Sequence, residues 1–214
     1  MYLPAHFEER RPEVLQALVR SHPLGLLITL KADGLCADPV PLMLDADAGL
    51  GTLRGHVARA NPLWRETRTE VEALVVFQGP QAYVSPSFYP SKAEHGKVVP
   101  TWNYCVVQAR GTLRAIDDAA WLHALVTRLT DRHEAPREVP WAVSDAPPEY
   151  IQTMLRAIVG IEITLTSLTG KWKVSQNHSA TNRDGVVQGL RLKAEATGDA
   201  QAAAMAALVE RGAG

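Results

Sequence analysis

The chain has 214 residues, of which 46% are hydrophobic and 21% charged, a composition typical of a folded globular protein rather than a disordered one. Its formal net charge of -1 gives no overall positive field, so contact with nucleic acid would need a local basic patch. The sequence shows neither a signal peptide nor an apolar run of the roughly 20 residues that a membrane span requires, so we expect a soluble, cytoplasmic protein without a membrane partner.

The first elements predict a helix followed by a β-hairpin. Pro12 opens an amphipathic stretch, and proline suits the first turn of a helix. Asp33 and Gly34 lie between two short apolar runs, a pattern typical of a hairpin turn. The second run carries Pro39 and Pro41. Two prolines confine a strand to a sheet edge, to a bulge, or to a place where a ligand replaces the neighbouring strand.

The next segments predict two strands around a short helix. Residues 50–56 read as a strand and residues 58–68 as a short helix. Residues 72–78 are strongly apolar and predict a buried strand that ends at Gly79-Pro80 and is continued by residues 82–85. Residues 86–96 predict an irregular loop.

The second half of the chain predicts one long strand, two helices and a further strand before an Ala-rich end. We expect one long strand or a bent pair over 98–113, a helix capped by Asp117 or Asp118 and a helix over 148–158. We also expect a half-buried strand around 161–165, in which polar residues such as Glu162 alternate with apolar ones, and a short helix over 185–190. We divide the chain into a domain over 1–190 with peripheral helices and an Ala-rich C-terminal tail over 191–214, helical or frayed.

These short runs joined by tight turns, with few helices between them, do not favour parallel βαβ units. The pattern predicts a mainly β protein with flanking helices, built on a partly closed antiparallel barrel. Cys36 and Cys105 lie in apolar stretches, so we expect buried free thiols rather than a disulfide. The histidines lack metal-ligand spacing, and we predict no metal site.

Three clusters of polar and aromatic residues could contact a ligand. The first contains His56, Arg59 and Asn61, where a strand leads into a helix. A cation, an imidazole and free backbone N–H groups at such a place suit a phosphate. The alternative interpretation is a solvated arginine and a histidine stacked on Trp64.

The second cluster, in the loop after the buried strand, contains Ser85, Lys92 and Lys97 among aromatic residues. Basic and aromatic side chains in alternation bind a planar anion or single-stranded nucleic acid, although such a loop can also be a surface loop pinned by its aromatic rings.

The third cluster brings together a hydroxyl, an indole and an amide, which can satisfy the polar edge of a heterocycle and cover its face. It contains Thr101, Trp102 and Asn103, and a similar set of side chains recurs at 171–177. At strand period, Lys171 and Lys173 share one face and Trp172 points to the other, so at least one of these faces is buried. The recurring set that we select as ligand candidates is Lys173, Gln176 and Asn177.

Five segments carry a resemblance to a known family. They are residues 54–64 (RGHVARANPLW), 75–87 (VVFQGPQAYVSPS), 89–92 (YPSK), 96–104 (GKVVPTWNY) and 170–177 (GKWKVSQN). In this order they resemble the FMN-binding negative transcriptional regulators of the PaiB type. The similarity runs from residue 1 to about 190 and leaves the Ala-rich tail outside it.

The resemblance implies an antiparallel split β-barrel of the flavin-reductase and pyridoxamine-phosphate-oxidase kind, which forms homodimers and binds FMN at the subunit interface. It implies that His56 and Arg59, with Lys92 or Lys97, neutralise the FMN phosphate. Thr101, Asn103 and Gln176 would hydrogen-bond the ring or the ribityl chain, and Trp102 or Trp172 would pack near the flavin. Phe88, Gln108 and His178 depart from the family pattern.

The function that the resemblance implies is repression of genes, directly or through the redox state of the flavin. The alternative is an FMN-dependent oxidoreductase, similar to flavin reductases, that does not bind DNA. The net charge and the lack of a helix-turn-helix signature speak against direct DNA binding, so a DNA partner is weakly supported. A pyridoxamine-phosphate oxidase would need a basic substrate-phosphate site, which the sequence does not indicate.

Overall fold

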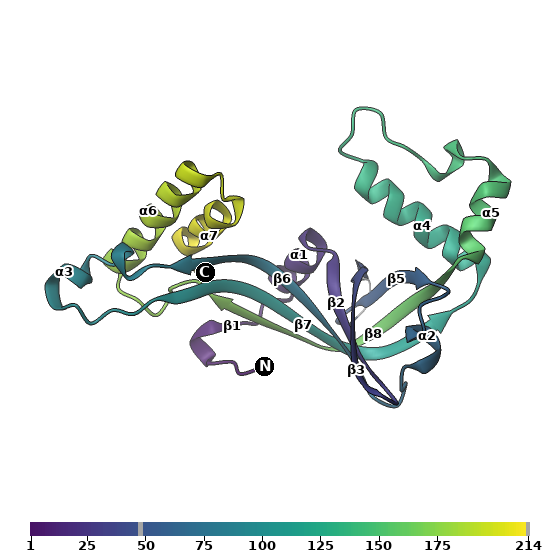
Figure 1. Ribbon diagram of the computed structural model, residues 1–214, viewed down its shortest axis with the longest axis horizontal. Coiled ribbons are helices and arrows are strands. Elements are labelled where there is room, and N and C mark those ends of the chain that lie inside the picture. The colour runs from purple at the N-terminus through teal and green to yellow at the C-terminus, as the bar shows by residue number, and fades with distance from the viewer. Residues whose placement is uncertain (47–48, 213–214) are drawn as a thin grey trace. The chain divides into compact units, whose positions relative to one another are not determined.

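The framework of the protein is one antiparallel sheet. The structure is a computed structural model that describes residues 1–46 and 49–212 (Figure 1). In this part of the chain the sheet has eight strands: seven follow the order β3-β2-β6-β7-β8-β5-β4, and the eighth, β1, pairs with β8. The strands are β1 (Glu8–Glu9), β2 (Leu24–Lys31), β3 (Gly34–Pro41), β4 (Met43–Asp45), β5 (Thr52–Ala58), β6 (Ala73–Val84), β7 (Thr101–Ile116) and β8 (Ile158–Lys173).

Helices flank the sheet, so the predicted class, mainly β with flanking helices, is confirmed (Figure 1). None of the helices in the described residues is both long and apolar enough to cross a membrane. The helices are α1 (Pro12–Ser21), α2 (Leu63–Glu66), α3 (Ser91–His95), α4 (Ala119–Glu134), α5 (Pro148–Arg156), α6 (Ala180–Thr197) and α7 (Ala200–Arg211).

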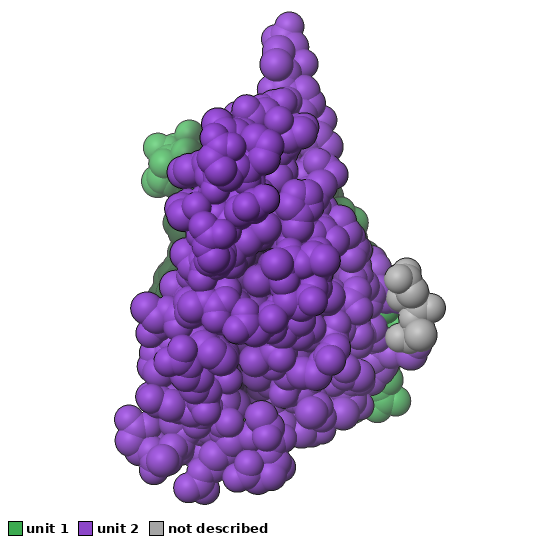
Figure 2. Space-filling view, turned by 90° about the vertical axis from the view of Figure 1, so that its right-hand side faces the viewer, with its two compact units in different colours: residues 1–18, 78–107, 169–214 green, residues 19–77, 108–168 purple. Residues whose placement is uncertain are grey.

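The chain divides into two compact units (Figure 2). Unit 1 contains Met1–Leu18, Gln78–Val107 and Thr169–Gly214, and unit 2 contains Val19–Phe77 and Gln108–Leu168. Strands β6, β7 and β8 each contribute residues to both units. This division follows the packing of distant segments, so it differs in kind from our predicted division of the sequence at residue 190, which stays a prediction.

In unit 2, the β2–β3 hairpin forms where the sequence predicts it. Lys31 pairs with Gly34 across a two-residue loop, and Gly34 has a φ of 126°, which is costly for any residue with a side chain. β3 lies at one end of the strand order, so the edge position expected from Pro39 and Pro41 is confirmed.

Strand β6 corrects one detail of the prediction, because it runs through Gly79-Pro80 without the expected interruption before residues 82–85. The register between β2 and β6 extends only from Leu26–Val76 to Ile28–Leu74, so Gly79-Pro80 lies beyond the stretch paired with β2. A proline that cannot donate a hydrogen bond is tolerated in such a position.

Several predicted helices are confirmed, with local causes. Pro12 opens α1. Asp118 caps α4 by accepting a 2.7 Å hydrogen bond from the Trp121 backbone N–H. The helix expected over 58–68 is shorter than predicted, because the chain first makes a turn. Asn61 Oδ1 then accepts from the Leu63 N–H at 2.8 Å and starts α2. The loop predicted over 86–96 contains α3.

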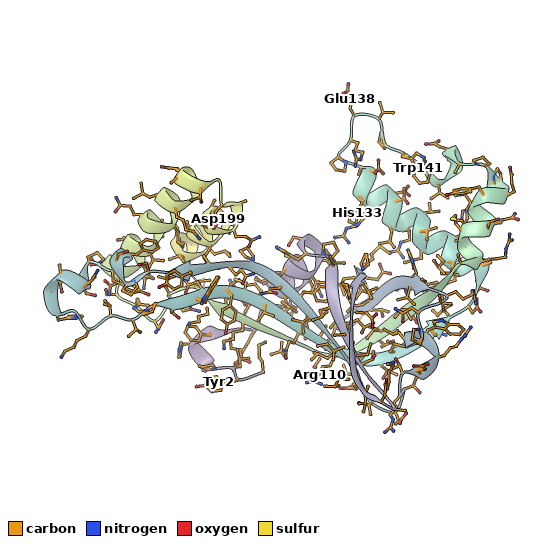
Figure 3. All side chains as sticks on the ribbon, viewed as in Figure 1. Tyr2, Arg110, His133, Glu138, Trp141 and Asp199 are labelled. Atoms are coloured by element: carbon orange, nitrogen blue, oxygen red, sulfur yellow. The ribbon has the colours of Figure 1, made fainter. Side chains whose placement is uncertain are left out.

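The C-terminal region of unit 1 is more helical than predicted. α6 is longer than the expected segment 185–190 and ends at Gly198, whose φ is 70°. Asp199 then caps α7 by accepting from the N–H groups of Gln201 and Ala202 at 3.0 and 3.1 Å (Figure 3). Our predicted tail boundary falls inside α6, and its last two residues, 213 and 214, lie outside the described residues.

Strand β8 departs from the predicted half-buried pattern in its unit 2 part. Glu162, expected to face solvent, is only 9% exposed. It is buried because Arg54 Nε and an Arg114 terminal nitrogen each donate to its carboxylate at 2.8 Å. Arg54 also donates to Asp45, which pairs in turn with Arg128, so β4, β5, β7, β8 and α4 of unit 2 share one charge network.

In unit 1, the end of β8 buries both of its faces. Trp172 is buried, and Lys171 is buried on the opposite face, where its ammonium lies 5.5 Å from the centre of the Tyr104 ring. Cys105 is a buried free thiol as predicted, and burial raises its pKa to about 12. Cys36, in unit 2, is only half-buried, and its Sγ lies 3.3 Å from Asp38 Oδ2.

Candidate functional site

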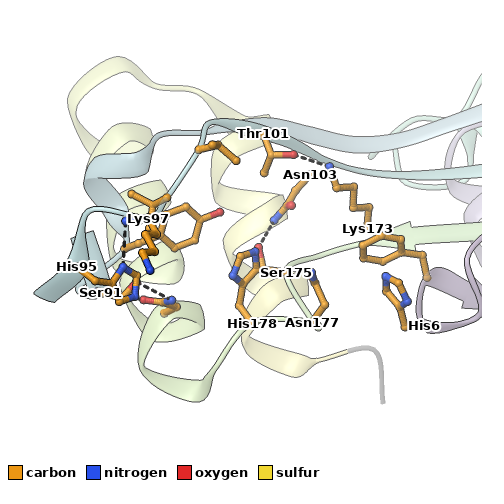
Figure 4. Close-up of a pocket in the computed structure, with 15 residues that line it drawn as sticks. His6, Ser91, His95, Lys97, Thr101, Asn103, Lys173, Ser175, Asn177 and His178 are labelled. Carbon is orange, nitrogen blue, oxygen red and sulfur yellow. Dashed lines mark hydrogen bonds between the residues drawn. The ribbon is translucent and has the colours of Figure 1, made fainter. Parts of the chain in front are cut away.

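The main candidate is a cavity of about 540 Å³ in unit 1, which we call the unit 1 cavity (Figure 4). Its walls come from the start of β7, the end of β8, the α3 segment and the start of α6. A volume of this size suits a cofactor or other small ligand. The structure brings together five of the residues predicted from the sequence as its lining: Lys97, Thr101, Asn103, Lys173 and Asn177.

The lining of the unit 1 cavity favours an anion. Lys97 and Lys173 contribute ammonium groups, and His6, His95 and His178 contribute imidazoles. Among the described residues that line the cavity there is no carboxylate. Cationic groups concentrated in a concave site attract negatively charged ligands.

Adjacent strand ends fix the position of Lys173. Its Nζ donates a short hydrogen bond to Thr101 Oγ1, from the neighbouring strand β7 (Figure 4). This contact leaves further N–H groups of the ammonium for a ligand, since a lysine has three donors.

Asn103 is the most deeply buried polar residue of the lining, with 1% of its surface exposed. Its Nδ2 donates to Ser175 Oγ at 2.9 Å, and its Oδ1 has no hydrogen-bond partner among the described residues. Ser175 holds this contact from a left-handed backbone conformation with a φ of 63°. An unpaired buried amide oxygen is costly, so it needs an explanation.

Tyr89 is a second such residue. It is 3% exposed, and its hydroxyl also lacks a partner within the described chain. Its ring stacks on His178 with 5.0 Å between centroids. Burial raises the pKa of Tyr89, and burial together with the charge of Lys173 lowers the pKa of His178, so both rings are favoured in their neutral forms.

Our sequence-based list of ligand residues did not include Tyr89, Ser175 or His178. Tyr89 and Ser175 lie within the segments that carry the family resemblance, but no spacing rule indicates that their side chains are buried. His178 departs from the pattern of the family that the sequence resembles. Contacts between segments far apart in sequence bring the three residues into one cavity.

The remaining predicted residues of unit 1 have other contacts. Ser85 Oγ accepts from the Ser87 N–H at 3.2 Å, and Lys92 lies exposed in α3. Trp102 is 53% exposed. Gln176 holds its own turn by donating to Trp172 O and accepting from the Val174 N–H. These residues do not line the unit 1 cavity, and their role in cofactor binding stays a prediction.

In unit 2, the predicted phosphate site is a turn whose polar groups bond to the protein. Arg59 donates to both carboxylate oxygens of Asp117 at 2.7 and 2.6 Å, and to two backbone carbonyl oxygens. Asn61 donates to Asp38 Oδ1 at 3.0 Å. His56 is half-buried, and burial lowers its pKa.

The alternative interpretation of this turn placed a histidine on Trp64. Instead, the Arg65 guanidinium lies over the Trp64 ring, 4.2 Å from its centroid. The indole N–H of Trp64 donates to Arg59 O at 3.0 Å. The convergence of this turn with the cavity residues on one ligand stays a prediction.

Comparisons with known proteins connect the chain to FMN. A family model described as "Putative FMN-binding domain" matches residues 1–167. An uncharacterised protein of Emericella nidulans is 38% identical over 225 residues, which cover 88% of this chain and 90% of that protein. The protease synthase and sporulation protein PAI 2 of Bacillus subtilis is 29% identical over 191 residues, 89% of each chain.

A solved structure supports the fold. The FAD and heme binding protein from Mycobacterium smegmatis superposes with a TM-score of 0.56 at 16% identity, over 78% of this chain and 73% of that one. The predicted split-barrel fold is confirmed by this likeness together with the antiparallel sheet.

The cavity residues fit FMN on chemical grounds. The two ammonium groups suit a phosphate, and the unpaired Asn103 oxygen and Tyr89 hydroxyl suit the polar edge of a flavin ring. Because the family model covers most of the chain, the protein belongs to the family described as "Putative FMN-binding domain", to which PaiB-type proteins are related, and FMN is its cofactor.

Proposed function

We propose that the protein is an FMN-dependent oxidoreductase whose flavin is held in the unit 1 cavity. The observation that supports this proposal best is that two buried polar groups without a partner, Asn103 Oδ1 and Tyr89 OH, line a cavity that also presents lysines. A buried polar group without a partner costs about 1–3 kcal/mol of stability, and a bound polar ligand that hydrogen-bonds to it would remove this cost.

Different residues of the cavity lining contact different parts of FMN. Lys97 and Lys173 neutralise the phosphate, while Thr101 fixes the Lys173 ammonium through its hydrogen bond. His178, neutral because its pKa is lowered, presents a stacked ring beside Tyr89 without adding charge. Bound FMN would supply hydride and electron transfer, and the protein would supply its position and electrostatic surroundings.

A regulatory role is a second candidate, favoured by the similarity to the Bacillus subtilis protein named for protease synthesis and sporulation. In this case the flavin would report a redox state, and repression would follow from the change of state. The net charge of -1 makes direct binding to DNA the weaker form of this proposal.

A homodimer, with FMN at the subunit interface, belongs to the same proposal. In unit 2 the register of β2, β3 and β6 places one row of apolar side chains on a single face, which we call the hairpin face. Its members are all exposed or half-buried, and a monomer rarely exposes so large an apolar patch. They are Leu24, Leu26, Ile28, Leu30, Leu35, Ala37, Pro39, Pro41, Leu74 and Val76.

Release and rebinding of the cofactor test the flavin. We expect purified protein, or protein supplied with FMN, to be yellow and to release FMN on denaturation, as identified by its fluorescence. NADH or NADPH should bleach the flavin absorbance without DNA. Protein that neither carries nor binds FMN would refute the proposal.

A gel-shift series across salt concentrations separates the two candidates. Direct binding to DNA phosphates must weaken steeply as salt rises. Salt-sensitive DNA binding without any reduction by NADH or NADPH would favour the regulator over the oxidoreductase.

Substitutions on the hairpin face test the dimer. Leu26→Glu and Leu35→Glu should shift the protein from dimer to monomer in a sizing measurement, because they place charge on the apolar face. Val71→Glu is the matched control, since Val71 is also exposed but lies outside the three strands. A wild-type protein that elutes as a monomer would contradict this part of the proposal.

A further inference from the structure

We propose that Asn103 and Tyr89 recognise the imide edge (–CO–NH–CO–) of the flavin ring, and that Ser175 positions Asn103 for this task. The inference rests on the proposed binding of FMN in the unit 1 cavity. It assigns recognition of the ring edge to Asn103 and Tyr89. Ser175 does not contact the ligand and acts only by positioning Asn103.

The side-chain amide of Asn103 is held so that its oxygen can accept a hydrogen bond from a ligand. One end of the side chain is fixed by the 2.9 Å hydrogen bond from Nδ2 to Ser175 Oγ, and the other end, Oδ1, is buried and unpaired in the cavity lining. An amide oxygen can accept two hydrogen bonds. The oxidised flavin ring carries one N–H group, between two carbonyls, and Asn103 Oδ1 accepts the hydrogen bond that this group donates.

Tyr89 complements this contact. Its hydroxyl is buried, unpaired and in the lining of the same cavity. A neutral phenol donates a hydrogen bond, and a carbonyl next to the imide N–H is the matching acceptor. A donor and an acceptor in one cavity therefore match the alternating groups of the imide edge.

Ser175 adopts a conformation that serves the site and not its own stability. Its φ of 63° lies in the left-handed region, which residues with a side chain seldom occupy. The residue is 2% exposed, and its hydroxyl meets the Asn103 amide. Strain of this kind persists where the surroundings hold it, and it concentrates at ligand sites.

Thr29 carries a buried, unpaired hydroxyl outside the unit 1 cavity. Its Oγ1 is the third buried side-chain atom without a partner in the described chain, and it belongs to β2 of unit 2. It does not line the unit 1 cavity. Thr29→Val is therefore a control that removes an equally buried hydroxyl without touching the ligand.

The experiment compares FMN with 3-methyl-FMN, in which a methyl group replaces the imide hydrogen, by fluorescence titration. Wild-type protein should bind the methylated flavin about 10- to 100-fold more weakly, because Asn103 Oδ1 then stays unpaired. Asn103→Leu should bind both flavins with similar affinity. Tyr89→Phe should weaken FMN about tenfold, and Thr29→Val should leave the affinity unchanged.

The melting temperature of the flavin-free variants separates a role in binding FMN from a role in holding the fold together. Tyr89→Phe removes a hydroxyl that has no partner, so the flavin-free variant should melt no lower than wild type while it binds FMN more weakly. Ser175→Gly keeps the left-handed backbone but removes the hydroxyl, so it should reduce the discrimination against 3-methyl-FMN, and the relief of backbone strain should offset part of the stability lost when Asn103 Nδ2 loses its partner. Ser175→Ala, which keeps both the strain and a Cβ, should reduce the discrimination equally.

The outcomes separate this inference from the proposed function. If wild-type protein binds FMN, but Asn103→Leu and Tyr89→Phe bind it as tightly and 3-methyl-FMN binds equally well, the inference is wrong and the proposed function stands. If wild-type protein binds no FMN, the proposed function fails and the inference with it.

Discussion

The unit 2 turn around Arg59 and the unit 1 cavity contain similar side chains but use them differently. Each has a cation, an amide and an aromatic ring at a strand end. In the turn, Arg59 and Asn61 bond to carboxylates and backbone groups of the protein. In the cavity, Asn103 and Tyr89 keep unpaired polar atoms.

The difference shows that residue types alone do not identify a binding site, because the hydrogen-bond partners of each polar group decide whether it is available. A polar group that the protein satisfies contributes to folding, whereas one that is buried and unpaired in the lining of a cavity is available to a ligand. The Arg54 network extends this contrast, because in unit 2 the buried Glu162 is paired with two arginines. The predictions below test whether polar groups in unit 2 stabilise the fold while those in the cavity bind FMN.

The largest expected effect is on stability, in Glu162→Ala. Removing the carboxylate deletes its bonds to Arg54, which keeps Asp45 as a partner, and to the exposed Arg114, and should lower the free energy of unfolding by about 1.5–3 kcal/mol. Urea denaturation measures it, with Glu138→Ala as the control because Glu138 lies exposed in the segment between α4 and α5 (Figure 3). Equal stability of the two variants would contradict a structural role for the network.

The next effect is on cofactor affinity, in Lys173→Met. Loss of the ammonium should weaken FMN binding about 10- to 100-fold, since charge-assisted bonds to phosphate are strong, while the melting temperature changes little. Lys92→Met is the matched comparison, because Lys92 does not line the unit 1 cavity. If Lys92→Met weakens FMN binding and Lys173→Met does not, the sequence-based assignment of Lys92 to the phosphate is preferred and the cavity assignment fails.

Local signals in the sequence predicted much of the fold. The turn at Gly34 and the cap at Asp118 depend on neighbouring residues, and both are confirmed. The pattern of short strands predicted a partly closed antiparallel barrel, and the family resemblance supplied its split form and the cofactor.

The features that sequence patterns missed depend on distant partners. Glu162 is buried because Arg54, 108 positions earlier in the chain, pairs with it. Asn103 and Ser175 are 72 positions apart in the sequence, so no spacing rule predicts that their side chains are in contact. Which polar groups are left unpaired is decided only after the chain has folded.

A smaller effect follows from pH. Burial would raise the pKa of Glu162, but the hydrogen bonds from Arg114 and Arg54 outweigh it and leave the pKa below its ordinary value of 4.5. The pKa of Asp45 is lowered by Arg128 and Arg54 in the same way. A carboxylate with a lowered pKa in the folded state stabilises the fold above its ordinary pKa, and this contribution is lost as pH falls through the folded value.

The free energy of unfolding of flavin-free protein should therefore fall steeply below about pH 4.5. A first, shallower decline should begin below about pH 6.5, because burial lowers the pKa of His56 and of His178 and so disfavours their charged forms in the folded state. Denaturant titrations over this range measure both steps. Glu162→Ala should reduce the acid step and leave the histidine step in place.

The smallest effect on FMN is expected for Arg59→Gln. Its guanidinium already donates to Asp117 and to the backbone oxygens of Arg156 and Ile158, so it would have to abandon these bonds to reach a phosphate. The variant should lose stability, because these bonds join the end of β5 to the helical segment before β8, yet it should bind FMN within about threefold of wild type. Asp117→Asn is the matched variant, because it weakens the same contact from the other side and should give the same pattern. A large loss of FMN affinity at unchanged stability in Arg59→Gln alone would mean that the arginine leaves Asp117 to bind the phosphate, and the contrast between the turn and the cavity would then be wrong.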